Sequence, residues 1–265
     1  MILFMLCSQF LLSQDQKQFE VGALPHLDLS NIAGDIEVTI GEPGAIMIRY
    51  EKEDDDVKVD FSQSGDRVTV RVDMPRRSHN KGGVSFKVTL PPETEVELKS
   101  ISGHITAKGL ARGGELETVS GNVRLDDSQG EFEASSVSGD VVVRKARGQY
   151  RLGSVSGSVM VEEMDHSTLK AESVSGHLTL SSATLDGEYR FETTSGNISI
   201  SHSRDASYRV RFDTFSGNVD YPEGANMSLK KEQYTPSKSL KGSYHDGKGS
   251  IEGETLSGSI RIVAR

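Results

Sequence analysis

The sequence predicts an all-β protein folded as a single-stranded β-helix, a β-solenoid with coils of about 18–21 residues. Three observations lead to this prediction. A Ser-Gly pair recurs eight times between Ser102 and Gly258, β-branched residues alternate after each pair, and only 35% of the residues are hydrophobic. A fixed period of this length is typical of a solenoid, in which each repeat forms one turn of a stack.

The repeat is defined by its glycine, taken as position 0, and by the serine at −1. The glycines are Gly103, Gly121, Gly139, Gly157, Gly176, Gly196, Gly217 and Gly258. The serines are Ser102, Ser120, Ser138, Ser156, Ser175, Ser195, Ser216 and Ser257. Successive glycines lie 18, 18, 18, 19, 20, 21 and 41 residues apart, and the last interval is expected to hold two coils.

Apolar residues at +2 and +4, such as Val141 and Val143, indicate a strand with one buried face. Apolar residues also stand at −5 and −7, and most residues at −2 are apolar. The residues at −2 are Ile101, Val119, Val137, Val155, Val174, Thr194, Phe215 and Leu256. If −2 and −5 both face the core, the chain must bend between them, at the Ser or Thr of −3.

The glycine is expected to permit a second bend, because a residue without Cβ adopts backbone angles closed to others. A third bend is expected in the polar link, for example at 126–130. Each coil is therefore predicted to have about three short sides around a narrow core. Such a coil buries too little to fold alone and has to stack on its neighbours.

The organisation along the chain is expected to have three parts. Residues 1–13 are a predicted signal peptide, residues 18–98 form N-terminal capping strands and first rungs, and residues 99–265 form the regular solenoid. A polar excursion at 222–248 interrupts the last part. We expect it to fold over the end or side of the final coils, since an uncovered last strand, 259–263, would leave backbone groups unpaired.

The apolar run of residues 2–12 is too short to span a bilayer, which takes about 20 residues, and it resembles the apolar part of a secretory signal. It lacks a preceding positive charge, so either the signal is atypical or the true start lies upstream. Cys7 is the only cysteine and would leave with the signal, so the mature chain is expected to have no membrane span and no disulfide. The formal net charge of −9 argues against a nucleic-acid partner.

Two sets of polar residues are candidates for binding. Hydroxyl groups at −3 and −1 could present an array to a carbohydrate or an ice-like lattice, but hydrogen bonds to the corner backbone are the favoured interpretation. Charges at −6 come in blocks of one sign and could form a docking face. We favour a solvated face, in which Glu172, Glu192 and Asp213 at −4 compensate the basic block.

Catalysis has little support in the sequence. Asp140 is the only carboxylate at +1, His104 and His177 lie four coils apart, and the motifs HExxH, GxSxG and GGxGxD are absent. We therefore expect no catalytic residue, no metal ligand and no cofactor.

The chain resembles the bacterial DUF4097 family, whose members are described as candidate adhesins and are related to the head-domain family DUF2807. The matching pieces lie within residues 20–265, and they are LDLSNIAGDIEV, KVTLPPETEVEL, the SVSGxV coils and GKGSIEGETLSGSIRI. The resemblance implies a right-handed single-stranded β-helix in an exported or envelope-associated protein. Some relatives are linked to envelope stress responses, and the family has no established catalytic residues.

The function expected from these observations is non-enzymatic. The chain is predicted to be an exported or envelope-associated module for adhesion, binding or stress sensing, located in the periplasm, at the cell surface or secreted, with an envelope protein or glycan as its partner. A purely structural envelope module and a glycan-active β-helix enzyme are the alternatives.

Overall fold

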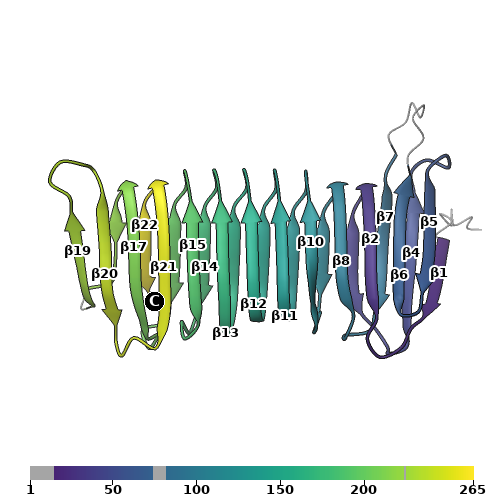
Figure 1. Ribbon diagram of the computed structural model, residues 1–265, viewed down its shortest axis with the longest axis horizontal. Helices are drawn as coiled ribbons and strands as arrows, with labels where there is room; N and C mark the ends of the chain where they lie inside the picture. Colours follow the sequence, from purple (N-terminus) through teal and green to yellow (C-terminus); the bar gives the residue numbers. More distant parts are fainter. Residues whose placement is uncertain (1–14, 74–81, 224) are drawn as a thin grey trace, which may run out of the picture.

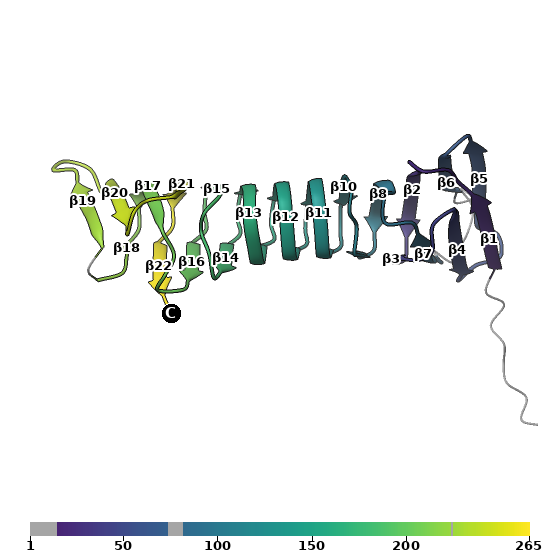
Figure 2. The same cartoon turned by 90° about the horizontal axis from the view of Figure 1, so that it is seen from below.

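The computed structural model describes residues 15–73, 82–223 and 225–265, so the predicted signal peptide lies outside the described residues. Within these ranges the protein is all-β, with 22 strands and no helix. The strands stack into a long, narrow β-solenoid in which two rows of strands lie back to back (Figures 1 and 2). None of the described segments is a helix long and apolar enough to cross a membrane.

The front row in Figure 1, here the front sheet, contains strands from both ends and the middle of the chain. In spatial order these are β5 (Lys58–Ser64), β6 (Arg67–Asp73), β2 (His26–Ala33), β8 (Glu95–Ser102), β10 (Gly113–Thr118), the second halves of β11 (Val123–Ser136), β12 (Val141–Ser154) and β13 (Val159–Ser173), then β15 (Glu188–Thr193), β21 (Gly249–Ser257), β17 (Tyr208–Ser216), β20 (Lys238–Tyr244) and β19 (Asn226–Lys231).

The rear sheet is built in the same way. In spatial order its strands are β1 (Asp15–Glu20), β4 (Ala45–Lys52), β7 (Val84–Leu90), β3 (Ile36–Ile40), β9 (Ile105–Lys108), the first halves of β11, β12 and β13, then β14 (Leu178–Ser182), β16 (Ile198–His202), β22 (Ile260–Ala264) and β18 (Val219–Asp220). The interior strands pair in parallel, and antiparallel pairing occurs only toward the two ends.

The core is a thin layer between the two sheets. Side chains at +2 and +4, such as Val141 and Val143, meet side chains at −5 and −7, such as Ala134 and Phe132, and all four are fully buried. Like residues pack on like ones in successive coils, as Phe132 stacks on Tyr150 at a ring-centroid distance of 5.6 Å. For these four positions the predicted facing is confirmed.

The predicted facing of the residues at −2 is wrong, because they point to solvent. The seven large apolar residues at this position are between 44% and 56% exposed, and Thr194 is exposed as well. Alternation continues unbroken from −7 through −5 to −3, so the Ser or Thr at −3 is buried and the residue at −2 is outside. The chain does not bend between −5 and −2. It reverses over −2 to +1, for example at 137–140, where the two sheets meet in a narrow tip.

The repeat glycines lie at this tip, one above another. A Cβ on Gly139 would overlap the carbonyl oxygen of Gly121, and a Cβ on Gly157 would overlap that of Gly139. None of the repeat glycines has the left-handed backbone conformation that favours glycine. The expected reason for glycine, backbone freedom, is therefore wrong. Glycine is needed because neighbouring coils approach too closely here for any side chain.

The Ser or Thr at −3 satisfies the backbone inside the tip. The Ser154 hydroxyl donates to the carbonyl oxygen of Gly139 in the neighbouring coil and accepts from the amide of Gly157 in its own coil, both at 2.9 Å. Bonds from the −3 hydroxyl to a glycine carbonyl are also made by Thr118, Ser136, Ser173, Thr193, Thr214 and Thr255. The prediction that hydroxyls bond the corner backbone is confirmed for this column.

Two coils from near the ends of the sequence are inserted between coils that come from elsewhere in the sequence. The β21–β22 coil lies between the β15–β16 coil and the β17–β18 coil, and the β2–β3 coil lies between β6–β7 and β8–β9. The interval between Gly217 and Gly258 therefore does not hold two stacked coils, and β22 is not the last rung. The insertion places Glu252 directly across from Arg190 on one side and Arg211 on the other. Opposite charges at facing positions of neighbouring strands stabilise their pairing.

The 222–248 excursion forms two further strands beyond the last coil. Strand β20 pairs antiparallel with β17, and β19 pairs with β20 (Figure 2). Beside this hairpin, buried Tyr208 stacks on Tyr244 at 5.5 Å and donates its hydroxyl hydrogen to Nε2 of His202 at 2.9 Å. Nδ1 of His202 donates to the carbonyl of Ser203 at 2.7 Å, and burial lowers the pKa of the ring, which favours the neutral form with Nε2 as the acceptor.

Adding one methyl group at the tip is expected to destabilise the fold. Gly139→Ala should lower the free energy of unfolding by about 2–3 kcal/mol, because the coils must move apart. Gly153→Ala is the control and should change it by less than about 0.5 kcal/mol, since a Cβ there meets only the Ser135 Cβ at 4.0 Å. Urea denaturation measures both, and equal losses would show that the tip tolerates separation.

The facing of the tip residues predicts which of three further variants loses the most stability. Ser154→Ala should cost about 1–3 kcal/mol, because it leaves a buried carbonyl and amide without a partner. Val155→Asp and Ser156→Ala should each cost less than about 1 kcal/mol, since both side chains are exposed. Thermal melts compare the three. A larger loss for Val155→Asp than for Ser154→Ala would contradict the geometry of the tip.

The neutral His202 predicts a pH dependence. Its folded pKa lies below the ordinary value of about 6.5, so the unfolded chain binds more protons and stability falls as the pH is lowered from about 7 to 5. His202→Gln should destabilise the protein at pH 7 but reduce this slope, by up to about 1 kcal/mol per pH unit. Burial also lowers the pKa of His26, so adding His26→Gln should flatten the slope further. Urea titrations at pH 7.5 and 5.5 test this, and an unchanged slope in His202→Gln would refute it.

Candidate functional site

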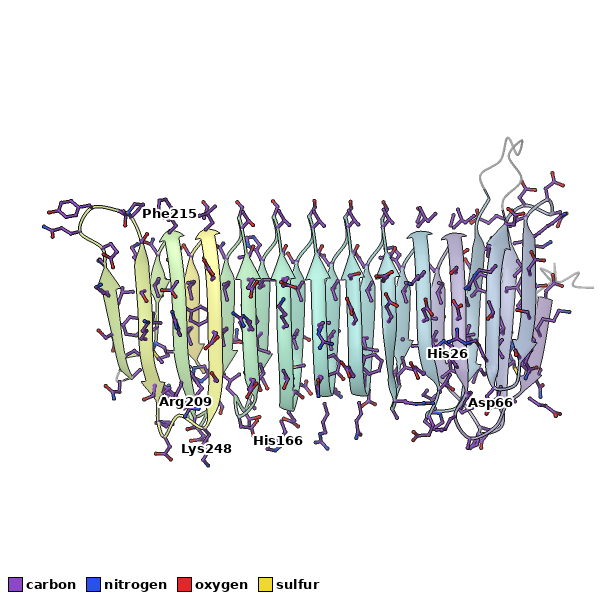
Figure 3. The ribbon with its side chains drawn as sticks, viewed as in Figure 1. His26, Asp66, His166, Arg209, Phe215 and Lys248 are labelled. Atoms are coloured by element: carbon purple, nitrogen blue, oxygen red, sulfur yellow. The ribbon has the colours of Figure 1, made fainter. Side chains whose placement is uncertain are left out.

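The outward residues at −2 form a continuous apolar row along one edge of the solenoid. The amide of Ser138 donates to the carbonyl of Val119 at 3.0 Å, and the amide of Ser156 donates to that of Val137 at 3.0 Å, so the backbone ladder continues through the tips. We call this row the tip ridge. In spatial order it consists of Ile101, Val119, Val137, Val155, Val174, Thr194, Leu256 and Phe215. Side chains project along this edge in Figure 3, where Phe215 is labelled.

The repeat serines at −1 stand next to the tip ridge. Their amides carry the ladder, as in Ser138 and Ser156, and their side chains are exposed. The repeat glycines of position 0 follow them and are covered by the neighbouring coils. Both sets of predicted repeat residues thus lie together at one edge, where they support the tip ridge.

A long groove follows the inner side of the tip ridge on the front sheet. One stretch, of about 600 Å³, lies between the ridge residues Val137, Val155, Val174, Thr194 and Leu256 and a row of residues at −4. A second stretch, of about 440 Å³, continues from Val137 and Ser135 to Ile101, Ile32 and Val72. Ser135 and Val137 line both stretches, so they form one tip groove. The buried hydroxyls of −3 are its floor.

The wall opposite the ridge, here the polar wall, consists of the residues at −4. In spatial order these are Arg71, Ser30, Lys99, Glu117, Ser135, Gly153, Glu172, Glu192, Glu254 and Asp213. Positive charge lies only in its first part, and its last four residues are all acidic. The tip groove therefore has one apolar wall and one wall whose charge changes along its length.

Carboxylates of the polar wall pair with the basic residues at −6. Lys170 contacts Glu172 at 2.8 Å, Arg190 contacts Glu192 at 2.8 Å, and Arg211 contacts Asp213 at 3.6 Å. The prediction that these two columns compensate each other is confirmed. Glu254 makes no ion pair with any described residue, so the inserted β21 leaves an uncompensated carboxylate in this wall.

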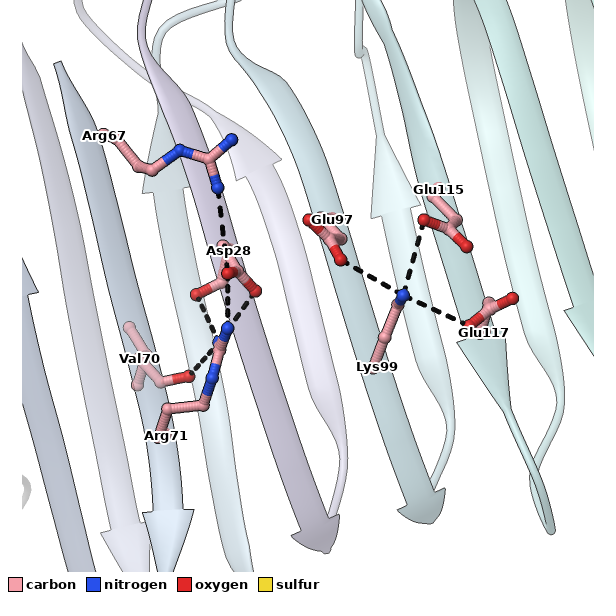
Figure 4. A network of polar contacts seen from close by, with 8 residues as sticks. All are labelled: Asp28, Arg67, Val70, Arg71, Glu97, Lys99, Glu115 and Glu117. Carbon is pink, nitrogen blue, oxygen red and sulfur yellow. Dashed lines mark hydrogen bonds and ion pairs between the residues drawn. The ribbon is translucent and has the colours of Figure 1, made fainter.

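At the other end of the wall, a lysine lies among three carboxylates. Lys99 Nζ is 3.1 Å from Glu97 and 3.5 Å from both Glu115 and Glu117 (Figure 4). The hydrogen bond with Glu97 and the nearby charges raise the pKa of Lys99, while burial raises the pKa of Glu115.

On the neighbouring β2, buried Asp28 is held by Arg71 and lies 3.8 Å from Arg67 (Figure 4). The hydrogen bonds from Arg71 lower the pKa of Asp28. Both ion-pair clusters join neighbouring strands of the front sheet, so they stabilise the register of the N-terminal coils beside the groove.

The opposite edge of the solenoid differs in character from the tip. Its bends carry Asp127, Lys145 and Glu163 in left-handed backbone conformations, at φ values of 56°, 53° and 56°. All three are exposed, and the hollow beside them is lined by charged residues such as Arg147 and Asp165. Apart from Leu24 and Tyr234, the large exposed apolar side chains of the described residues all lie at the tip edge.

The residues considered for catalysis belong to a structural ladder at +1. Nδ1 of His104 accepts from the amide of Asn122 at 2.9 Å, Oδ1 of Asp140 accepts from the amide of Ser158 at 2.8 Å, and Nδ1 of His177 accepts from the amide of Asn197 at 3.1 Å. Asn122, Asn197 and Ser259 of the same column also accept from a backbone amide of a neighbouring coil, so Asn, Asp, His and Ser suit this position because they carry an acceptor. In the described part of the chain, no three His, Cys, Asp or Glu residues are grouped to hold a metal ion.

The tip ridge is the feature that the sequence analysis missed, because hydropathy assigned its residues to the core. The alternation of side chains could have found it. In a strand, side chains at −7, −5 and −3 point to the same face, which is the buried one. The side chain at −2 therefore points outward.

Two solved structures align with the chain over most of its length. A candidate adhesin from Bacteroides fragilis is 13% identical, with 95% of this chain and 97% of that chain covered and a TM-score of 0.52. A candidate cell adhesion protein from Clostridium sporogenes is 12% identical, with 96% and 100% covered and a TM-score of 0.26. The Bacteroides protein shares the fold, and at this low identity the likeness extends to the fold alone. No curated protein matches the chain.

The ordered coils and the tip glycines all fall within one family match. The family model described as Toastrack DUF4097 matches residues 25–263, which is nearly all of the described chain. The chain therefore belongs to the DUF4097, or Toastrack, family.

Proposed function

We propose that this protein is a non-catalytic binding module of an exported or envelope-associated protein, and that adhesion through the tip ridge is its function. The observation that carries the proposal is the row of seven large apolar side chains, each about half exposed, along a single edge. Soluble proteins rarely expose a contiguous apolar patch of more than a few hundred Å² unless it binds something.

The chemistry of the site supports binding rather than turnover. The Asp, Asn and His side chains at +1 are already used as backbone acceptors, and three carboxylates of the polar wall are in ion pairs. A glycan-active enzyme needs a pair of carboxylates with different protonation states on either side of a sugar. We therefore propose that the chain has no catalytic centre. A purely structural module would not need the exposed ridge.

The likeness to a candidate adhesin supports an adhesive function, and the predicted signal at residues 1–13 supports export. An envelope protein or glycan is the proposed kind of partner. Adhesion and stress sensing both begin with such binding, so the ridge is the place to test either.

A bead-retention experiment tests this proposal. Beads coated with the protein are passed over immobilised bacterial envelope fragments. The ridge variant carries Val137→Lys, Val155→Lys and Val174→Lys, which put charges on exposed positions without changing the core. Its dissociation constant for the fragments should rise at least about tenfold, a loss of ~1.4 kcal/mol.

The matched control, the sheet variant, carries Val142→Lys, Met160→Lys and Thr179→Lys. These half-buried residues lie at +3 of the same three coils, on the outer side of the rear sheet. The sheet variant should be retained like the parent. Equal retention of the parent and the ridge variant would refute the ridge as the binding surface.

A further inference from the structure

The two ends of the solenoid are uneven, and their outlines are complementary (Figure 2). At the end formed by β1 and β5, here the head, the strands beyond the β6–β7 coil are β5 in the front sheet and β4 and β1 in the rear sheet. At the end formed by β19 and β20, here the tail, both strands lie in the front sheet, and no described strand follows β18 behind them. A front overhang at the tail therefore meets a rear overhang at the head.

Hydrophobic side chains that pack against the core remain half-buried at both ends. At the head these include Phe19 and Phe61, whose rings stack at a centroid distance of 6.1 Å. At the tail they include Met227 and Leu229 of β19. Leu240 of the neighbouring β20 is fully buried, and the chain leaving β18 passes behind that strand (Figure 2). The open part of the core at the tail is thus the inward face of β19.

We infer that the tail of one copy binds the head of the next, so that β19 pairs with β5 and the two cores become continuous. The inference goes beyond the proposed function, because this junction is formed by the ends of the solenoid and leaves the tip ridge free. A head and a tail are different surfaces, so the contact is heterologous and repeats from copy to copy. Because the body is nearly untwisted, the result is a straight, open-ended filament (Figure 1).

Strand direction allows this pairing without turning either copy. Strand β19 runs in the direction of the front strands, since it is antiparallel to β20 and β20 is antiparallel to β17. Strand β5 runs against the front strands, since it is antiparallel to β6 and β6 is parallel to β2. Copies stacked in the same orientation therefore bring two antiparallel edges together, as in a hairpin.

The backbone groups at the edge of β19 are turned toward the next copy. The amide of Gly249 donates to the carbonyl of Ser207, so Gly249 bonds toward β17, and Tyr208 opposite it bonds toward β20. Backbone direction alternates along each strand and is shared by opposite residues of an antiparallel pair. Followed across β20, this alternation directs the N–H and C=O groups of Met227 and Leu229 to the free edge.

The edge of β5 is turned outward at the matching residues. The amide of His26 donates to the carbonyl of Asp66, so His26 bonds toward β6, and Arg67 opposite it bonds toward β5. The same alternation then directs the N–H and C=O groups of Val59 and Phe61 to the free edge of β5. Both edges therefore present the backbone groups of their inward-facing residues.

The heights of the two strands agree as well. Followed through the pairing of neighbouring strands, Leu229 and Phe61 both stand at the height of −5, and every residue of β19 has a partner in β5. In this register Lys230 lies opposite Asp60, which makes no ion pair with a described residue of its own copy. Lys230 already contacts Glu232 at 3.0 Å, so charge is compatible with this register, and backbone and apolar facing select it.

The overhangs exclude the two-fold alternatives. Two tails joined through β19 would leave four front strands with no described strand behind them. Two heads joined through β5 would place each β1 where the other copy has β4. In the head-to-tail junction β1 lies behind β19, so that Phe19 covers its inward face. The inward face of β1 also carries Asp15 and Lys17, whose opposite charges lie two residues apart and can pair when covered.

Two variants block one end each. The tail variant carries Met227→Pro and Leu229→Lys, and the head variant carries Val59→Pro and Asp60→Lys. The amides of Met227 and Val59 point to free edges, where proline is tolerated, so no hydrogen bond within one copy is lost. Asp60→Lys places a lysine opposite Lys230. Circular dichroism melts confirm that each variant is folded.

Association is measured with protein expressed from the full-length gene, by sedimentation velocity between about 1 and 500 µM. The mean mass of the parent should keep rising with concentration, past the dimer. The tail variant and the head variant should each have an association constant at least about tenfold lower. Mixed together, they should form one-to-one dimers that grow no further, because each supplies the end that the other lacks. The ridge variant and the sheet variant should associate like the parent.

A parent that stays monomeric over this range, or stops at the dimer, would overturn the head-to-tail junction. Tail and head variants that do not form dimers when mixed, although both are folded, would overturn it as well. So would association that is lost in the ridge variant alone. These failures are separable from failure of the proposed function, because a monomeric parent whose beads still bind envelope fragments through the ridge leaves that function standing.

Discussion

At every tip, the glycine backbone of one coil packs against the carbonyl oxygen of the glycine in its neighbour, with no room for a side chain between them. This contact lets the two sheets converge to a narrow edge. The interior of that edge accepts only the hydroxyl of the −3 residue, as at Ser154, which hydrogen-bonds both glycines. The next residue, Val155, is therefore forced outside. The apolar ridge is thus a direct consequence of how tightly the coils stack.

The two ends of the stack are formed in the same manner. At each end a coil from near a chain terminus is inserted one place inward, and antiparallel strands from a longer connection pair with the coil outside it. Because the β21–β22 coil pairs on both sides, its strand edges are not available to other chains. The inserted coil also adds Glu254 to the polar wall and Leu256 to the tip ridge, so the end architecture extends the candidate binding surface.

The surface chemistry of the solenoid is divided between its edges and faces. Ion pairs between −6 and −4 stabilise the front sheet, and the +1 ladder uses its Asp, Asn and His side chains to join coils. These charged and polar side chains are thus engaged in holding coils together. The ridge is the contrasting feature: its side chains stabilise no neighbouring coil through the core, yet they repeat along the whole stack.

The sequence by itself determined the solenoid, the coil length and the core columns, because the Ser-Gly period and the alternation at Val141 and Val143 are local properties. It also indicated the cross-pairing of charges and the bonding of the −3 hydroxyls. The tertiary structure alone decided the facing of Val155, because a valine has the same hydropathy on either side of a tip whose width is set by glycine contacts. It also decided where the β21–β22 coil lies. That position depends on a backbone ladder with strands distant in sequence, in which Glu252 enters between Arg190 and Arg211.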